Sequence, residues 1–141
     1  MTCSQDKLSN YKFHAIDVSP LKRTQQTAAA LGYLENALVS DLLLEMDFGP
    51  WEGKEKSDLL RHHREDWQTQ PDFITFGEPF QGLVTRVTNF METIKIGGKS
   101  SSILVFCHGF WARCLLALMD HGNARLCNQL HLDNGEITAR T

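Results

Sequence analysis

The stretch "SILVFCHGFWARCLLALM", residues 102–119, limits the folds open to this chain more than any other segment does. It contains the continuous apolar run 103–107, which is typical of a strand buried on both faces. Apolar residues at helical spacing follow at once and predict a helix over 110–121. A buried strand that leads directly into a helix is the building unit of α/β proteins. The stretch therefore predicts a mostly parallel sheet covered by helices, with His108 at the junction of strand and helix.

The remainder of the chain repeats this alternation of strands and helices. Further strands are predicted over residues 11–19 and 37–45. Helices are predicted over residues 19–31, 55–67 and 79–94. The alternation predicts an α/β three-layer sandwich with a mostly parallel central sheet, formed by residues 1–141 as a single domain.

The ends of these segments carry signals of their own. Ser19 can cap the helix that follows it, and Pro20 suits a first turn, where a missing N–H costs nothing. Residues 1–10 are expected to form a flexible lead-in. The turn signal Asp133–Asn134–Gly135 predicts one or two short strands in the C-terminal tail.

Composition narrows the classes of partner. The 141 residues carry a formal net charge of −3 and are 42% hydrophobic, which gives no reason to expect nucleic acid or an acidic membrane as partner. No apolar run is long enough to span a membrane, and the N-terminus lacks the apolar core of a signal peptide. The four cysteines form no Cys-x-x-Cys pair. We therefore expect a cytoplasmic protein with reduced thiols.

Three polar side chains stand where ligands collect in a parallel sheet. Ser19, Glu45 and His108 each lie at the carboxyl end of a predicted strand. In an open parallel sheet these strand ends form the crevice in which ligands bind. The sequence therefore predicts one site built from three segments that are distant in the chain.

Arg23 lies one turn into the helix that begins near Ser19. A helix N-terminus favours an anion, and a guanidinium beside it can add a bidentate grip on phosphate oxygens. The alternative is a solvated surface arginine, which is what most helix arginines are. Taken alone, Arg23 does not decide between the two.

Glu45 and His108 each allow two interpretations. Glu45 enters a loop with aromatic residues, so desolvation is expected to raise its pKa and suit it to general-acid chemistry. The alternative is a carboxylate in a turn hydrogen bond. His108, followed by Gly109, can donate a hydrogen bond to a phosphoryl group, or it is a satisfied core histidine. Arg113, a turn further on, either approaches the same pocket or lies on the helix surface.

Four blocks of sequence resemble, in their order and spacing, those of the histidine phosphatase superfamily. The blocks are "SPLKRTQQTA" (19–28), "LLLEMDFGPWEG" (42–53), "FGEPFQGLVTRV" (76–87) and "ILVFCHGFWAR" (103–113). The resemblance covers residues 13–140 and is to the phosphoglycerate mutase-like branch, with small bacterial phosphatases such as α-ribazole phosphatase the most similar in kind. It implies a phosphoglycerate mutase-like fold and a phosphate or small phosphoester as partner, with no metal and no cofactor.

The resemblance also implies roles for single residues. Arg23 matches the arginine that grips the phosphate, and His108 matches the second pocket histidine, which holds the transferring phosphoryl group. Glu45 matches the acid that protonates the leaving group. Gly77 and Glu78 match part of a Gly-Gly-Glu-Ser loop near the substrate, although the residues that flank them depart from the family pattern.

One block of the family has no match in these residues. The family's nucleophile is a histidine in an Arg-His-Gly motif after the first strand, and the residues before Ser19 contain no such motif. His14 is the sole upstream histidine, and it lies within a predicted strand that corresponds to a different one, so we do not expect it to be the nucleophile. His62 and His63 are expected to be solvated, with a metal site there as the weaker alternative.

The same block supplies a strand in the family. That strand is central and pairs beside the equivalent of residues 103–107, so its absence leaves backbone groups without ladder partners. The vacant position could be filled by residues 1–10, by an element exchanged with a second copy, or by sliding of the strands. A homodimer through this position is therefore one prediction.

Three functions remain open from the sequence. The first is an N-terminally shortened histidine phosphatase domain that binds phosphate or a phosphoester and is weakly active or inactive. The second is a working phosphomonoesterase, α-ribazole phosphatase-like or of broad specificity. The third is a non-catalytic, self-associating interaction module whose pocket residues are relics.

Overall fold

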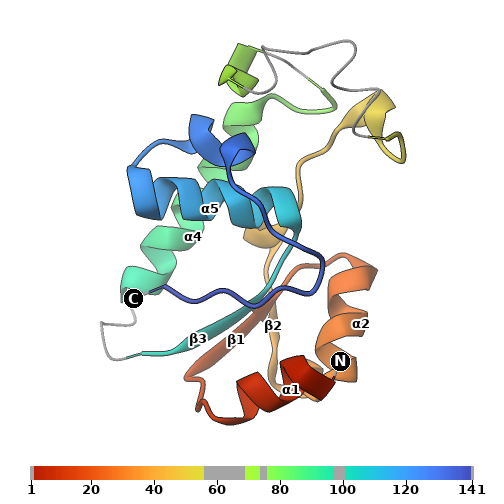
Figure 1. Ribbon diagram of the computed structural model, residues 1–141, viewed down its shortest axis with the longest axis vertical. Coiled ribbons are helices and arrows are strands. Elements are labelled where there is room, and N and C mark those ends of the chain that lie inside the picture. Colours follow the sequence, from red (N-terminus) through yellow and green to blue (C-terminus); the bar gives the residue numbers. More distant parts are fainter. Residues whose placement is uncertain (1, 56–68, 74–75, 97–100, 141) are drawn as a thin grey trace.

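The computed structural model describes residues 2–55, 69–73, 76–96 and 101–140 (Figure 1). Within these ranges the strands are β1 (Ala15–Val18), β2 (Leu38–Val39) and β3 (Ile103–Phe106). They form a sheet in the order β2-β1-β3, and both neighbouring pairs are parallel. The helices are α1 (Thr2–Ser9), α2 (Lys22–Ala30), α4 (Phe80–Ile96) and α5 (Gly109–His121). Short 3₁₀ turns lie at Leu34–Asn36, Asp41–Leu43, Gly49–Trp51, Pro71–Phe73 and Ala124–Gln129.

Helices cover both faces of the sheet, which gives the three layers that the sequence predicts. In Figure 1, α1 and α2 lie on one side of the strands, and α4 and α5 lie on the other. Leu8 of α1 and Ala28 of α2 are buried with Val18 and Phe106 of the sheet. A second cluster of buried apolar side chains, which includes Leu83 of α4 and Trp111 of α5, joins these two helices, and Val105 of β3 packs against it. The α/β prediction, with its parallel sheet, is confirmed.

The elements with the strongest apolar periodicity form where the sequence predicts them. The helix expected from residue 79 spans Phe80–Ile96 and buries Phe80, Leu83, Val87 and Phe90, which recur on one face. The strand at 103–107 and the helix at 110–121 are confirmed as β3 and α5 within one residue at each end. However, only Phe106 of β3 is buried, and β1 is the only strand that pairs with β3 in the described part of the chain.

Two predictions near the N-terminus are wrong. Residues 1–10 were expected to be flexible, yet Thr2–Ser9 form α1, because Leu8 is 4% exposed and is anchored in the core beneath the sheet. Ser19 does not cap the following helix. That helix begins at Lys22, its N-cap is Leu21, and no side chain makes a capping hydrogen bond there.

Two predicted strands are shorter than expected or absent. The strand over 37–45 is reduced to Leu38–Val39, since Ser40 Oγ accepts a hydrogen bond from Leu42 N at 3.3 Å and starts a 3₁₀ turn. Residues 128–140 contain no strand, because no sheet edge pairs with them there. The turn expected around Asp133 is present, with Gly135 at a φ of +76°. The helix expected over 55–67 lies outside the described residues except for Glu55.

No helix in the ranges that the structure describes is both long and apolar enough to cross a membrane.

Candidate functional site

His108 and Ser19 meet where two neighbouring strands end. β1 ends at Val18 and β3 ends at Phe106, and the two strands are paired in parallel, so the residues that follow them lie side by side. His108 Nε2 lies 2.8 Å from Ser19 Oγ, and both residues are buried. Ser19 Oγ also accepts a hydrogen bond from Leu21 N at 3.3 Å. The hydroxyl that the sequence assigned to a helix cap therefore orients the imidazole instead.

The environment of His108 keeps its imidazole neutral. Burial, with a smaller contribution from the nearby positive charge of Arg23, lowers the pKa of His108 to about 4. At neutral pH one ring nitrogen is then a hydrogen-bond donor and the other an acceptor. A neutral imidazole that is held by a serine can present a fixed donor to an oxyanion, without carrying a positive charge of its own.

Arg23 supplies the positive charge at this edge of the sheet. It lies in the first turn of α2 and is exposed to solvent. Its effect on the pKa of His108 places the guanidinium within electrostatic reach of the imidazole. The partial positive charge of the helix N-terminus adds to that of the guanidinium. The start of α2 is therefore the most favourable place in this site for an anion.

Glu45 follows the turn Asp41–Leu43 rather than a strand, and its carboxylate caps α5. Oε1 accepts hydrogen bonds from Met46 N and from Trp111 N, and Oε2 accepts one from Phe110 N, each at 3.0 Å. Burial raises the pKa of Glu45 and outweighs these three hydrogen bonds, which lower it together with Arg113. A raised pKa of Glu45 is what the sequence predicts. The carboxyl lies against the start of α5, as its hydrogen bonds with Phe110 N and Trp111 N show.

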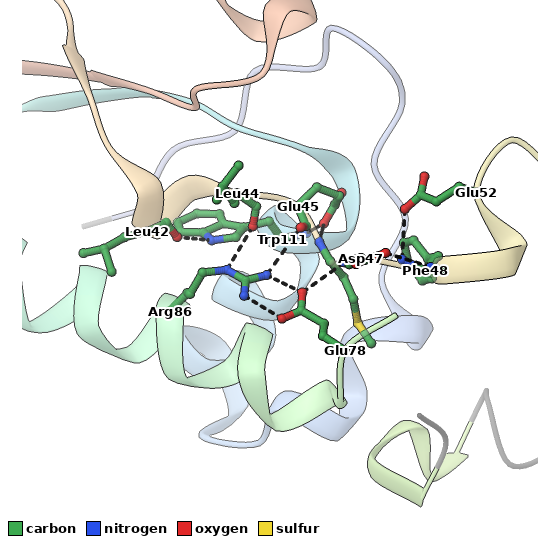
Figure 2. A network of polar contacts seen from close by, with 11 residues as sticks. Leu42, Leu44, Glu45, Asp47, Phe48, Glu52, Glu78, Arg86 and Trp111 are labelled. Atoms are coloured by element: carbon green, nitrogen blue, oxygen red, sulfur yellow. Dashed lines mark hydrogen bonds and ion pairs between the residues drawn. The ribbon is translucent and has the colours of Figure 1, made fainter. Parts of the chain in front are cut away.

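Arg86 of α4 lies at the centre of a polar network beside Glu45 (Figure 2). Its guanidinium makes a bidentate ion pair with Glu78, with both nitrogen–oxygen distances at 2.7 Å. It also donates to two backbone oxygens, those of Leu44 at 3.2 Å and Glu45 at 3.3 Å. The ion pair with Arg86 is the largest cause that lowers the pKa of Glu78.

A cavity of about 520 Å³ joins several of these residues. Its lining residues come from the start of α2, the segment after the Asp41–Leu43 turn, and the beginning of α4; they are Leu21, Arg23, Leu44, Glu45, Met46, Asp47, Glu52, Glu78 and Arg86. Three of the residues singled out from the sequence, Arg23, Glu45 and Glu78, are thus brought to one cavity. His108 and its partner Ser19 are not among the residues that line this cavity.

Other candidate residues lie elsewhere. Gly77 donates its N–H to Asp47 O at 3.0 Å, and a Cβ there would collide with the Asp47 carboxylate, so this glycine serves a close approach of two loops. Arg113 stacks on the Phe110 ring at 5.3 Å from its centroid and acts on Glu45 by its charge. His14 stands at the amino end of β1, the end remote from His108, and its Nδ1 accepts a hydrogen bond from Ser102 N at 3.0 Å.

The sequence did not point to Arg86 or Asp47 as parts of the site, and it ranked Glu52 below Glu45 as the acid. Arg86 was part of a recognised block, but nothing in its helical spacing marks it, because its partner Glu78 precedes the helix. His62 and His63 fall outside the described residues. Among the residues that are described, no group of three or more His, Cys, Asp or Glu side chains could hold a metal ion.

Comparison with known proteins gives a consistent picture. The family model described as the histidine phosphatase superfamily (branch 1) matches residues 2–140. A bifunctional protein of Mycobacterium tuberculosis is 31% identical over 133 residues, which are 88% of this chain and 36% of that protein. Phosphoserine phosphatase 1 of Hydrogenobacter thermophilus is 29% identical over 109 residues, 72% of this chain and 52% of that enzyme. The chain thus spans about a third to a half of these two relatives.

Solved structures show the same fold. The crystal structure of the α-ribazole phosphatase from Shigella flexneri superimposes with a TM-score of 0.71 at 26% sequence identity. The match covers 92% of this chain and 68% of that one.

Proposed function

This chain belongs to the histidine phosphatase superfamily, and from that premise we propose that its site binds the phosphoryl group of a small phosphomonoester. The observation that carries the proposal is the contact between His108 and Ser19 at the joined ends of β1 and β3, with Arg23 within electrostatic reach. A positive side chain, a helix N-terminus and a fixed imidazole converge at one edge of the sheet. These are the groups that recognise a phosphate.

Each residue would act on a different part of the ester. Arg23 would grip the non-bridging phosphate oxygens, and His108 would donate a hydrogen bond to the phosphoryl group as charge builds on it. Glu45 would give its proton to the oxygen of the leaving group, a role that suits a carboxyl whose pKa is raised by burial. After the transfer, the Glu45 carboxylate would keep its three N–H donors.

We expect the 141-residue polypeptide to bind phosphoesters and to turn them over weakly or not at all. The resemblance assigns the nucleophile to a histidine in an Arg-His-Gly motif, which these residues do not contain. The competing function is an active phosphomonoesterase. It is favoured by relatives that are themselves named as phosphatases, acting on phosphoserine and on α-ribazole phosphate.

Hydrolysis of p-nitrophenyl phosphate, measured together with phosphate binding, separates these functions. We expect inorganic phosphate to bind in isothermal titration calorimetry, and His108→Ala to weaken that binding about tenfold, the value of one hydrogen bond to a charged group. We expect the same rate of hydrolysis for the wild-type protein and for His108→Ala. Thermal unfolding of both proteins checks that the variant is folded.

Two outcomes would contradict this expectation. Turnover that His108→Ala abolishes would establish the active phosphomonoesterase and a nucleophile not identified above. Absence of any phosphate binding by the folded protein would leave the self-associating interaction module as the remaining function.

We also propose a homodimer formed through the free edge of β3. In the described part of the chain, β3 pairs only with β1, so its other edge presents unpaired backbone groups. Residues 2–9 form α1 and pack under the sheet, so they do not fill the position. A second copy can supply a strand at that edge.

We also propose a cytoplasmic location. The unpaired thiols of Cys107, Cys114 and Cys127 are compatible with it.

Sedimentation equilibrium tests the dimer directly. We expect a species of twice the 16.0 kDa chain mass, which dissociates on dilution because few backbone hydrogen bonds join the copies. A mass of 16.0 kDa at every concentration up to the millimolar range would overturn the proposal.

A further inference from the structure

We propose that Arg86 is a positioning residue that holds Glu45 in register with the start of α5, so that the Glu45 carboxyl keeps a fixed place at the first turn of the helix that follows His108. The proposal rests on the proposed function, because it gives the position of Glu45 a purpose in phosphoester chemistry. It is carried by the geometry of the network in Figure 2, which connects α4 to the segment that bears Glu45.

The Arg86 guanidinium fixes the main chain of that segment. Nε donates to Leu44 O at 3.2 Å, and Nη2 donates to Glu45 O at 3.3 Å. Nη1 and Nη2 also donate to the two carboxylate oxygens of Glu78, each at 2.7 Å. A planar guanidinium can satisfy four acceptors in these directions at once, whereas an ammonium group cannot.

Glu78 also binds the segment that bears Glu45, through Asp47. Its Oε1 accepts the N–H of Asp47 at 3.0 Å, two residues beyond Glu45. The backbone N–H groups of Gly77 and Glu78 both donate to Asp47 O, at 3.0 and 3.2 Å. The main chain from Leu44 to Asp47 is therefore held at three carbonyls and one N–H by one arginine and one loop.

The side chain of Glu45 connects this fixed stretch of main chain to α5. Its carboxylate accepts hydrogen bonds from Phe110 N and Trp111 N, both at 3.0 Å. His108 directly precedes that helix, and His108 O accepts the N–H of Ala112 at 2.8 Å. Arg86 is thus connected, through the main chain and side chain of Glu45, to the first turn of α5, and His108 is the residue that directly precedes this turn.

A glycine beside the ion pair supports the same assignment. Gly82 lies in the first turn of α4, where glycine is disfavoured relative to alanine. A Cβ at this position would lie 2.7 Å from Glu78 Oε2, the oxygen that Arg86 Nη1 binds. The absence of a side chain at Gly82 leaves the space in which the Glu78 carboxylate meets Arg86.

A direct role for Arg86 in gripping the phosphate is the competing explanation, since Arg86 also lines the cavity. Its contacts argue against that role. The nitrogens Nε, Nη1 and Nη2 all donate within the protein, and Glu78 already neutralises the charge. Arg23, in contrast, is exposed and makes no such ion pair in the described residues.

The test compares Arg86→Lys with Arg125→Lys. Arg125 makes the same bidentate contact, with Asp72 at 2.8 and 3.0 Å, but on the surface and away from the cavity. The pKa of the Glu45 carboxyl is followed by ¹³C NMR on protein labelled at the glutamate side chains. In Arg86→Lys we expect this pKa to fall toward its ordinary value, because the released carboxyl becomes solvated. We expect no change in Arg125→Lys.

Titration with inorganic phosphate supplies the second measurement. A positioning role predicts that Arg86→Lys changes the phosphate affinity less than threefold, while a direct grip predicts a loss like that of Arg23→Ala. An unchanged Glu45 pKa in Arg86→Lys, or a large loss of phosphate affinity, would overturn the proposal. If Arg86→Lys does not fold, Gly82→Ala displaces the Glu78 carboxylate from Arg86 while leaving the arginine in place, and we expect it to lower the Glu45 pKa as well.

The NMR measurement needs neither turnover nor bound phosphate. If the protein binds no phosphate at all, the proposed function fails, yet the Glu45 pKa still decides whether Arg86 holds this carboxyl.

Discussion

Arg23→Ala is expected to lower the affinity for inorganic phosphate about 30- to 160-fold, while leaving the fold intact. Arg23 is exposed in the first turn of α2, so its side chain contributes little to the core. A bidentate pair of charge-assisted hydrogen bonds to a phosphate contributes roughly 2–3 kcal/mol. The loss should appear in isothermal titration calorimetry as a higher Kd, with an unchanged melting temperature.

Lys22→Ala is the matched control for this variant. Lys22 is the preceding residue of the same helix, is exposed and carries the same charge. Its removal subtracts only long-range attraction, so we expect a loss of phosphate affinity of less than about threefold at physiological salt. Equal losses in the two variants would mean that the phosphate responds to the general charge of α2, and the assignment of Arg23 would then fail.

Trp111→Ala is expected to lower the free energy of unfolding by about 3–5 kcal/mol, the range found when a buried aromatic side chain is truncated. Trp111 is 0% exposed and packs edge-to-face on Phe90 of α4, with 5.4 Å between the ring centroids. Its indole N–H donates to Leu42 O at 2.8 Å. One side chain therefore joins α5, α4 and the turn before Glu45. Urea denaturation followed by circular dichroism measures the loss.

Trp111→Phe separates packing from hydrogen bonding at this position. Phenylalanine keeps an aromatic ring against Phe90 but leaves Leu42 O without its indole donor. We expect a smaller loss of about 1–3 kcal/mol, the cost of leaving a partly buried acceptor unpaired. A loss below about 1 kcal/mol in Trp111→Ala would contradict the view that this residue anchors the hydrophobic cluster between α4 and α5, because cavities of this size are costly.

The parts of the fold that could be predicted from the sequence are those that local pattern determines. The apolar face of α4 and the passage from β3 to α5 are set by residues a few positions apart, and both form as expected. The prediction of a strand over 37–45 is wrong beyond Val39, because a strand does not depend on local pattern alone. A strand needs a neighbour along its length, and after Val39 the chain turns so that Leu43 enters the core.

The candidate site shows the same division. The positions of Ser19 and His108 at one edge of the sheet follow from the alternation of strands and helices, whereas Glu45 follows a turn and not the strand end that the sequence predicts. The contacts of these residues do not follow from the alternation, because Ser19 and His108 are separated by 89 positions, and Glu45 and Phe110 by 65. Arg86 gives no local signal for the same reason, since its backbone contacts lie 41 and 42 positions away.

The carboxyl group of Glu45 occupies the N-terminus of α5 and leaves the N-terminus of α2 for a phosphate. Both α2 and α5 begin at this edge of the sheet, and each begins with a partial positive charge. The first N–H groups of α5 already donate to the Glu45 carboxyl, so the start of α2 is the one left open to an incoming phosphate in this site. In the proton-donor role proposed for Glu45, the negative charge left on the acid falls on the N–H groups of α5. The N-terminus of α5 would then stabilise this negative charge, which favours transfer of the proton to the leaving group.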